Sequence, residues 1–152
     1  MRSGFVVGAP KLIAAVTRFR NTCAPQVPIP VLKASAAAWD DEAHVEKNRA
    51  RYRERFDVAR RILGNHRGFR LPDGGFYLWL DVGDGPAFAK ALFQETGVRV
   101  LPGAFMSVER VPGDRSTNPG YRYVRLALVH DLKTVTAALE RVADFLQGAW
   151  RQ

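Results

Sequence analysis

One charged side chain stands inside the most strand-like stretch of the sequence, YRYVRLALV at residues 121–129. Side chains alternate between the two faces of a strand, so Val124 and Leu126 share the face opposite Arg125. No carboxylate lies within two residues of Arg125, and a buried guanidinium needs an anionic partner. Because the planar guanidinium binds a carboxylate through two parallel hydrogen bonds, Arg125 is a candidate for holding a carboxylate ligand. The alternative is an edge-strand arginine in water.

The basic side chains are concentrated in one segment. The net charge is +8, from 23 Lys and Arg against 15 Asp and Glu, and residues 46–70 supply +6 of it. A helix of this charge could bind the phosphates of nucleic acid, although a solvated helix face is the commoner explanation. A small basic module that binds nucleic acid or an acidic partner therefore stays as the alternative function. His44 and His66 have no second ligand at metal spacing, so we expect no metal site.

Length and composition indicate a globular domain. The chain has 152 residues, of which 47% are hydrophobic, enough to form a core. The single cysteine, Cys23, excludes an internal disulfide and is typical of a reducing compartment. The sequence has no apolar run of bilayer length and no signal-peptide pattern at its start, so we expect a soluble, cytoplasmic protein without a membrane partner.

Hydrophobic spacing predicts an α+β fold, in which a small antiparallel or mixed sheet is backed by helices. Helices are expected at residues 10–19, 31–39, 41–63, 86–96 and 131–146, and strands at 3–8, 69–71, 76–82, 98–101 and 121–129. The proline-rich segment 20–30 and the segment 102–120, rich in glycine and proline, are predicted loops. Asp40 or Asp41, and later Asp131, are predicted helix caps, and Gly97 is a predicted helix end.

Four motifs follow one another along the chain: RSGFVVG at 2–8, PDGGFYLWL at 72–80, VLPGAFMS at 100–107 and YVRLALV at 123–129. Together they resemble the C-terminal part of a fold-type I, pyridoxal-phosphate-dependent aminotransferase of class I/II, and the resemblance covers essentially the whole chain. DEAHVEKNRARYRERF at 41–56 and TNPGYRYVRLALV at 117–129 are more closely similar to the N-succinyldiaminopimelate aminotransferases of bacterial lysine biosynthesis.

The resemblance implies roles for three residues. Arg2 matches the arginine that pairs with the phosphate of pyridoxal 5'-phosphate, and Arg125 matches the arginine that holds the substrate α-carboxylate. Phe76 resembles the aromatic residue near the substrate pocket. The family transfers an amino group between amino acids and 2-oxo acids and forms homodimers, in which the segment matching 20–30 reaches toward the neighbouring site.

The chain also departs from the family pattern. The large domain and its Schiff-base lysine would lie upstream of Met1, and none of the five lysines present matches the Schiff-base motif. The resemblance therefore assigns no catalytic residue and implies that the chain alone is inactive. We therefore expect the chain to be a truncated product, a fragment, one piece of a split enzyme or a pseudogene remnant. Residues 1–43 are expected to be a remnant of the large domain with interdomain helices, and residues 44–152 the small domain.

Overall fold

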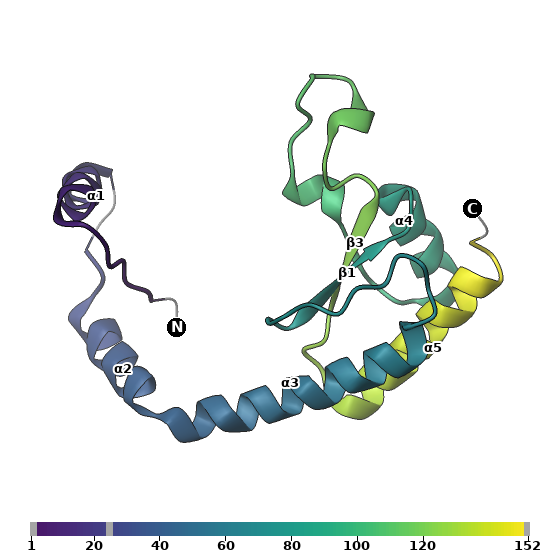
Figure 1. The fold of residues 1–152 in the computed structure, drawn as a ribbon, viewed down its shortest axis with the longest axis horizontal. Helices are drawn as coiled ribbons and strands as arrows, with labels where there is room; N and C mark the ends of the chain where they lie inside the picture. Colours follow the sequence, from purple (N-terminus) through teal and green to yellow (C-terminus); the bar gives the residue numbers. More distant parts are fainter. Residues whose placement is uncertain (1–2, 24–25, 151–152) are drawn as a thin grey trace. The chain divides into compact units, whose positions relative to one another are not determined.

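The structure is a computed structural model that describes residues 3–23 and 26–150. Its chain divides into two compact units, Met1–Lys47 and Asn48–Gln152, and the division falls within one long helix, α3 (Glu42–Leu63) (Figure 1). The expectation that residues 1–43 derive from a large domain stays a prediction.

The first unit consists of α1 (Pro10–Cys23), α2 (Ile29–Asp40) and the start of α3. Residues 3–9 have no regular secondary structure, so the predicted strand at 3–8 is wrong. A strand needs a neighbouring strand for its backbone hydrogen bonds, and the described residues of this unit form none. The segment is instead held by the Phe5 ring, 5.2 Å from that of Trp39, and by the Ser35 hydroxyl, which donates to Ser3 at 2.8 Å.

Helices in the first unit differ from the predicted ones at their ends. α1 continues through Cys23, so the first four residues of the predicted loop 20–30 are helical. α2 begins two residues earlier than expected, with a proline in its first turn, where a missing N–H costs nothing. Asp41 separates α2 from α3. Hydrogen bonds from the His44 N–H and ring, and from the Ala43 N–H, hold the pKa of Asp41 below its ordinary value. Asp41 is therefore the cap.

The first unit is expected to be cleaved by proteases well before the second. Every buried hydrophobic side chain among the described residues lies at or after Val58, whereas Phe5, Leu12, Phe19 and Trp39 are at least 60% exposed. Segments with few buried contacts open at low free-energy cost. Limited proteolysis followed by mass spectrometry should place the early cuts before residue 41. Equal protection of residues 3–40 and 48–150 would contradict this prediction.

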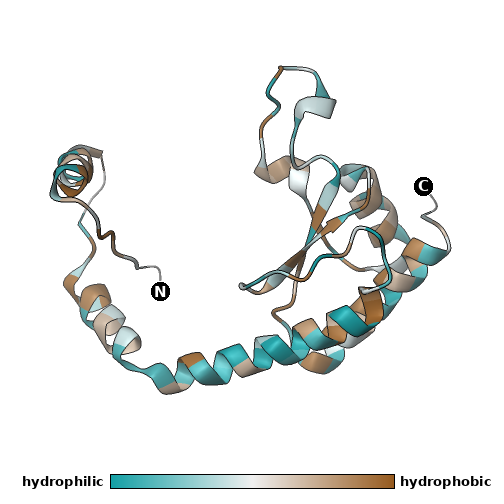
Figure 2. Cartoon of the chain, in the orientation of Figure 1, coloured by the Kyte–Doolittle hydropathy of each residue, from teal (hydrophilic) through white to brown (hydrophobic). Residues whose placement is uncertain are grey.

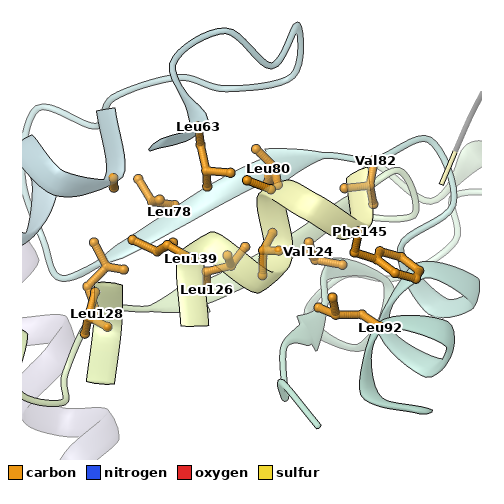
Figure 3. Packing of buried hydrophobic residues seen from close by; sticks show 14 of the residues in the cluster. Leu63, Leu78, Leu80, Val82, Leu92, Val124, Leu126, Leu128, Leu139 and Phe145 are labelled. Carbon is orange, nitrogen blue, oxygen red and sulfur yellow. The ribbon is translucent and has the colours of Figure 1, made fainter. Parts of the chain in front are cut away.

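The second unit contains a three-stranded antiparallel sheet in the order β1 (Tyr77–Asp81), β3 (Tyr123–Ala127), β2 (Leu101–Pro102). Helices α4 (Gly85–Thr96) and α5 (Leu132–Gln147), with the end of α3, supply the apolar residues that cover one face. Figure 3 shows leucines and valines of β1 and β3 meeting residues of these helices, including Leu63 and Leu139. The predicted α+β class is confirmed, and the sheet is antiparallel.

Two predicted strands are largely or wholly absent. Phe69–Leu71 forms no strand, and of residues 98–101 only Leu101 pairs, together with Pro102. Both segments have β-prone side chains, but strand formation also requires a partner backbone along the whole segment. Beyond Arg125 the β2 side of β3 is unpaired within the part of the chain that the structure describes.

Helix ends in the second unit follow local chemistry. Asp84 caps α4 by accepting a hydrogen bond from the Ala87 N–H at 2.9 Å, and Gly97 ends it with φ 72°, a conformation that costs glycine little. Asp131 caps α5 by accepting from the N–H of Thr134 at 2.9 Å, a bond that lowers the pKa of Asp131. The sequence predicted two of these positions, Gly97 and Asp131. α3 is hydrophilic over most of its length (Figure 2), as its arginines require.

The segment between β2 and β3 folds back on itself through two 3-10 turns, Gly103–Met106 and Arg115–Thr117. Asn118 is buried and holds the segment together: its Oδ1 accepts from the Ser107 hydroxyl at 2.5 Å and from the Gly120 N–H at 2.9 Å. A Cβ at Gly103 would lie 2.5 Å from the Gly120 carbonyl oxygen, so the two backbones meet where a side chain has no room. This predicted loop is therefore ordered by specific contacts.

Candidate functional site

Arg125 lies at the centre of the sheet, on the face away from the helices. β3 is the middle strand, so the edge-strand alternative for Arg125 is wrong. The register places Trp79 of β1 on one side of Arg125 and Leu101 of β2 on the other. The alternation expected from the sequence is confirmed, because Val124 and Leu126 are buried in the core beneath. The side chain of Arg125, the charged residue in the middle of β3, therefore lies on the sheet face opposite the hydrophobic core.

The guanidinium of Arg125 has unused hydrogen-bonding capacity. Its Nε atom is buried and has no hydrogen-bond partner, and no ion pair within the described residues involves this side chain. The Cζ atom lies 5.3 Å from the centroid of the Tyr77 ring, a cation–π contact that orients the fork. A buried donor without a partner is costly, and a carboxylate would satisfy Nε together with a terminal nitrogen.

Aromatic side chains form a row across the same face. Tyr77 lies 6.3 Å from Trp79, which lies 6.4 Å from Tyr123, each pair edge to face. Such contacts favour fixed ring orientations. Sequence reasoning marked Arg125, and the alternation of residues 121–129 puts Tyr123 on the same face, but it did not identify Tyr77 and Trp79 as neighbours. Period-2 alternation in β1 does place Tyr77 and Trp79 on one face, but the pairing of β1 with β3 is what brings them to Arg125.

Phe76 joins this row at its end. Its ring lies 5.4 Å from that of Tyr77 and 6.1 Å from that of Tyr52, and it is 45% exposed. The Phe76 carbonyl accepts a hydrogen bond from the Leu128 N–H at 2.8 Å, which fixes the start of β1 against β3. The structure thus brings Phe76 close to Arg125 through the shared neighbour Tyr77. Arg2, the third residue singled out from the sequence, lies outside the described residues.

Polar contacts fix the first residues of the central strand. Arg122 donates to the Asp81 carboxylate at 3.1 Å, and the Tyr121 hydroxyl donates to Asp84 at 3.0 Å. Gly85 lies so close to β3 that a Cβ there would be 2.3 Å from the Tyr123 carbonyl oxygen. These contacts join β3 to β1 and to the start of α4. The backbone of β3, which carries the side chains of the outer face, is therefore held rigidly.

Two further observations on the described residues concern metal ions and membranes. No group of three His, Cys, Asp or Glu side chains there could hold a metal ion. No helix in residues 3–23 or 26–150 is long and apolar enough to cross a membrane. The arrangement around Arg125 is an unpaired guanidinium on an aromatic face, which can bind and orient a carboxylate.

Comparison with known proteins places the chain in a family. The sequence profile described as aminotransferase class I and II matches residues 1–142. A probable aminotransferase of Mycobacterium tuberculosis is 35% identical over 143 residues, which cover 93% of this chain and 32% of the relative. An LL-diaminopimelate aminotransferase of Natranaerobius thermophilus is 29% identical over 150 residues, which cover 95% of this chain and 36% of the relative.

A solved structure agrees with the sequence matches. The crystal structure of an aminotransferase from Neisseria meningitidis superposes with a TM-score of 0.80 and 41% identity, over 99% of this chain and 37% of that chain. The chain thus spans about a third of the length of the relatives it matches. The expected resemblance is confirmed.

Proposed function

Because the chain belongs to the class I and II aminotransferase family, we propose that its second unit binds the carboxylate of an amino acid or 2-oxo acid during amino-group transfer. The observation that carries the proposal is the buried Nε of Arg125, which has no hydrogen-bond partner. A donor left unsatisfied in the free protein is accounted for when a ligand supplies the acceptor.

Each residue of the site has a role in this proposal. Arg125 donates two parallel hydrogen bonds to the substrate α-carboxylate. The Tyr77 ring beside the guanidinium holds this planar group in one orientation. Phe76 and Trp79 supply apolar walls that limit water around the bound carboxylate. Holding the carboxylate at a fixed place orients the α-carbon for reaction, which is how a binding residue raises a rate.

Pyridoxal 5'-phosphate supplies the electron sink for amino-group transfer when it is bound. We assign Arg2 to its phosphate, since a guanidinium matches phosphate oxygens bidentately. The residues that follow fit an anion: residues 3–23 include no Asp or Glu and carry Lys11, Arg18 and Arg20. In the described part of this segment, Ser3 is held by the Ser35 hydroxyl at 2.8 Å.

For the substrate we propose N-succinyl-LL-2,6-diaminopimelate, in lysine biosynthesis. The support is the motif pair at 41–56 and 117–129, together with a relative named LL-diaminopimelate aminotransferase. We further propose that the enzyme acts in the cytoplasm as a homodimer, in keeping with the single cysteine and with the family resemblance.

A chimera tests whether this segment serves a transaminase. Residues 1–152 would replace the matching third of the Neisseria meningitidis aminotransferase, to which they are 41% identical. The expected result is a folded enzyme with transaminase turnover, measured as 2-oxo acid formed, on amino donors that carry an α-carboxylate. Correct folding with full cofactor loading but no turnover on any such donor would contradict the proposal.

The 152-residue chain alone is expected to show no transaminase turnover with pyridoxal phosphate. None of its five lysines matches the family's Schiff-base motif, so any adduct should be weak and spread over several lysines. Borohydride reduction followed by peptide mass spectrometry would locate adducts. A stable adduct on a single lysine, accompanied by turnover, would contradict this prediction.

A further inference from the structure

The loop that precedes β1 is fastened to the end of that strand. The His66 ring Nε2 donates to the Asp81 carbonyl at 3.0 Å, and the Asp81 N–H donates to the Gly68 carbonyl at 3.3 Å. A Cβ at position 68 would lie 2.2 Å from the Asp81 carbonyl oxygen, so only glycine allows this approach. The loop is therefore held at a defined place beside the outer face of the sheet.

A cavity of about 340 Å³ lies between this loop and the sheet. Arg67 and Arg70 line it from the loop, and Trp79 and Tyr123 line it from the sheet. Both aromatic residues belong to the row that carries Arg125. The cavity thus offers two guanidinium groups above an aromatic wall, a combination that suits an acidic group joined to an apolar chain.

Both arginines are free to bind a ligand. Arg67 and Arg70 are exposed, and neither makes a hydrogen bond, ion pair or ring contact within the described residues. Among the described residues that line the cavity, Asp81 is the one with a carboxylate. This carboxylate already accepts hydrogen bonds from Arg122 at 3.1 Å and from the Gly83 N–H at 3.1 Å. The cavity therefore keeps unused positive charge.

Arg125 and the cavity occupy neighbouring places on one sheet face. Trp79, which lines the cavity, pairs directly with Arg125 across the two strands. The Arg125 guanidinium lies beside Tyr77, and the cavity reaches Asp81, four residues further along β1. At about 3.4 Å per residue, the strand positions beside Arg125 lie roughly 7 to 14 Å from the Asp81 end of the cavity. One elongated molecule with an acid at each end could span this distance along the aromatic row.

We propose that the cavity of Arg67 and Arg70 is a second anion subsite, which takes the distal acidic group of an elongated substrate whose α-carboxylate is held by Arg125. This inference rests on the proposed function and names its substrate class, amino or oxo acids with a second acidic group about 10 Å away. A monoacid can occupy only one of the two sites at a time.

Binding of suberate, an extended diacid, to the 152-residue chain tests the inference. Its monomethyl ester, with the same chain length and one acid, is the matched ligand, and dissociation constants would be compared by NMR titration at constant ionic strength. We expect suberate to bind about fivefold more tightly than the ester, as two partly exposed charge-assisted contacts allow. The double variant Arg67→Gln, Arg70→Gln should lose this advantage, whereas Arg53→Gln, Arg61→Gln, with equal loss of charge on α3, should keep it.

The outcomes separate the inference from the function on which it rests. Equal affinity of the parent for suberate and its ester, or an advantage that survives in the Arg67→Gln, Arg70→Gln variant, overturns the second subsite. If the Arg53→Gln, Arg61→Gln variant loses the advantage equally, the tighter binding of suberate comes from net charge alone, and the subsite is also overturned. If ester binding by the Arg67→Gln, Arg70→Gln variant is unaffected by adding Arg125→Ala, the carboxylate-binding function itself is overturned. Circular dichroism of each variant would verify that it folds.

Discussion

Replacing Arg125 with alanine in the chimeric aminotransferase is expected to lower kcat/KM by about two to three orders of magnitude. The reason is the loss of a bidentate, charge-assisted contact to carboxylate in a partly dehydrated site, worth on the order of 2 to 5 kcal/mol. Arg125→Lys keeps the charge but loses the planar fork, so an intermediate kcat/KM is expected. Steady-state kinetics on one amino donor would measure both variants.

Thermal stability distinguishes this role from a structural one. Arg125 has no ion-pair partner in the described residues, so its removal leaves no acid unpaired, and Tm should change little. Arg53→Ala, an exposed arginine on α3, is the matched control and should retain both parental kcat/KM and parental Tm. An Arg125→Ala enzyme that is as stable and as active as the parent would remove Arg125 from the site.

Replacing Phe88 with alanine is expected to lower the free energy of unfolding of the second unit by about 3 to 5 kcal/mol. Phe88 is fully buried in α4, and its ring lies 5.4 Å from that of Phe145 and 5.2 Å from that of Trp150. The substitution leaves a cavity between two aromatic rings that cannot close it. Because domains of this size are stable by only about 5 to 15 kcal/mol, much of the total would be lost.

Urea unfolding monitored by tryptophan fluorescence would measure this loss, since Trp150 packs in the same cluster and donates to the Val82 carbonyl at 3.0 Å. Phe93→Ala is the matched control on the same helix, because Phe93 is 46% exposed and should contribute about 1 kcal/mol or less. Equal losses for the two variants would show that the Phe88 cluster is not the core that the structure indicates.

Local chemistry in the sequence determined much of the second unit. Gly97 and Asp131 end and begin helices because a glycine tolerates positive φ and an aspartate accepts from the first turn, and both effects act within a few residues. The alternation of residues 121–129 likewise placed Val124 and Arg125 on opposite faces, and Val124 is the one buried in the core. These features depend on neighbours in the chain, which a single sequence displays.

Contacts between distant residues were decided only by the tertiary structure. Residues 3–8 and 98–101 have the composition of strands, yet the first forms no strand and the second pairs only at Leu101, because pairing depends on a partner backbone elsewhere in the chain. The same dependence explains the site. The strand pattern singled out Arg125 without a partner, but the pairing of β1 with β3 set the Tyr77 ring beside Arg125 and Trp79 across from it.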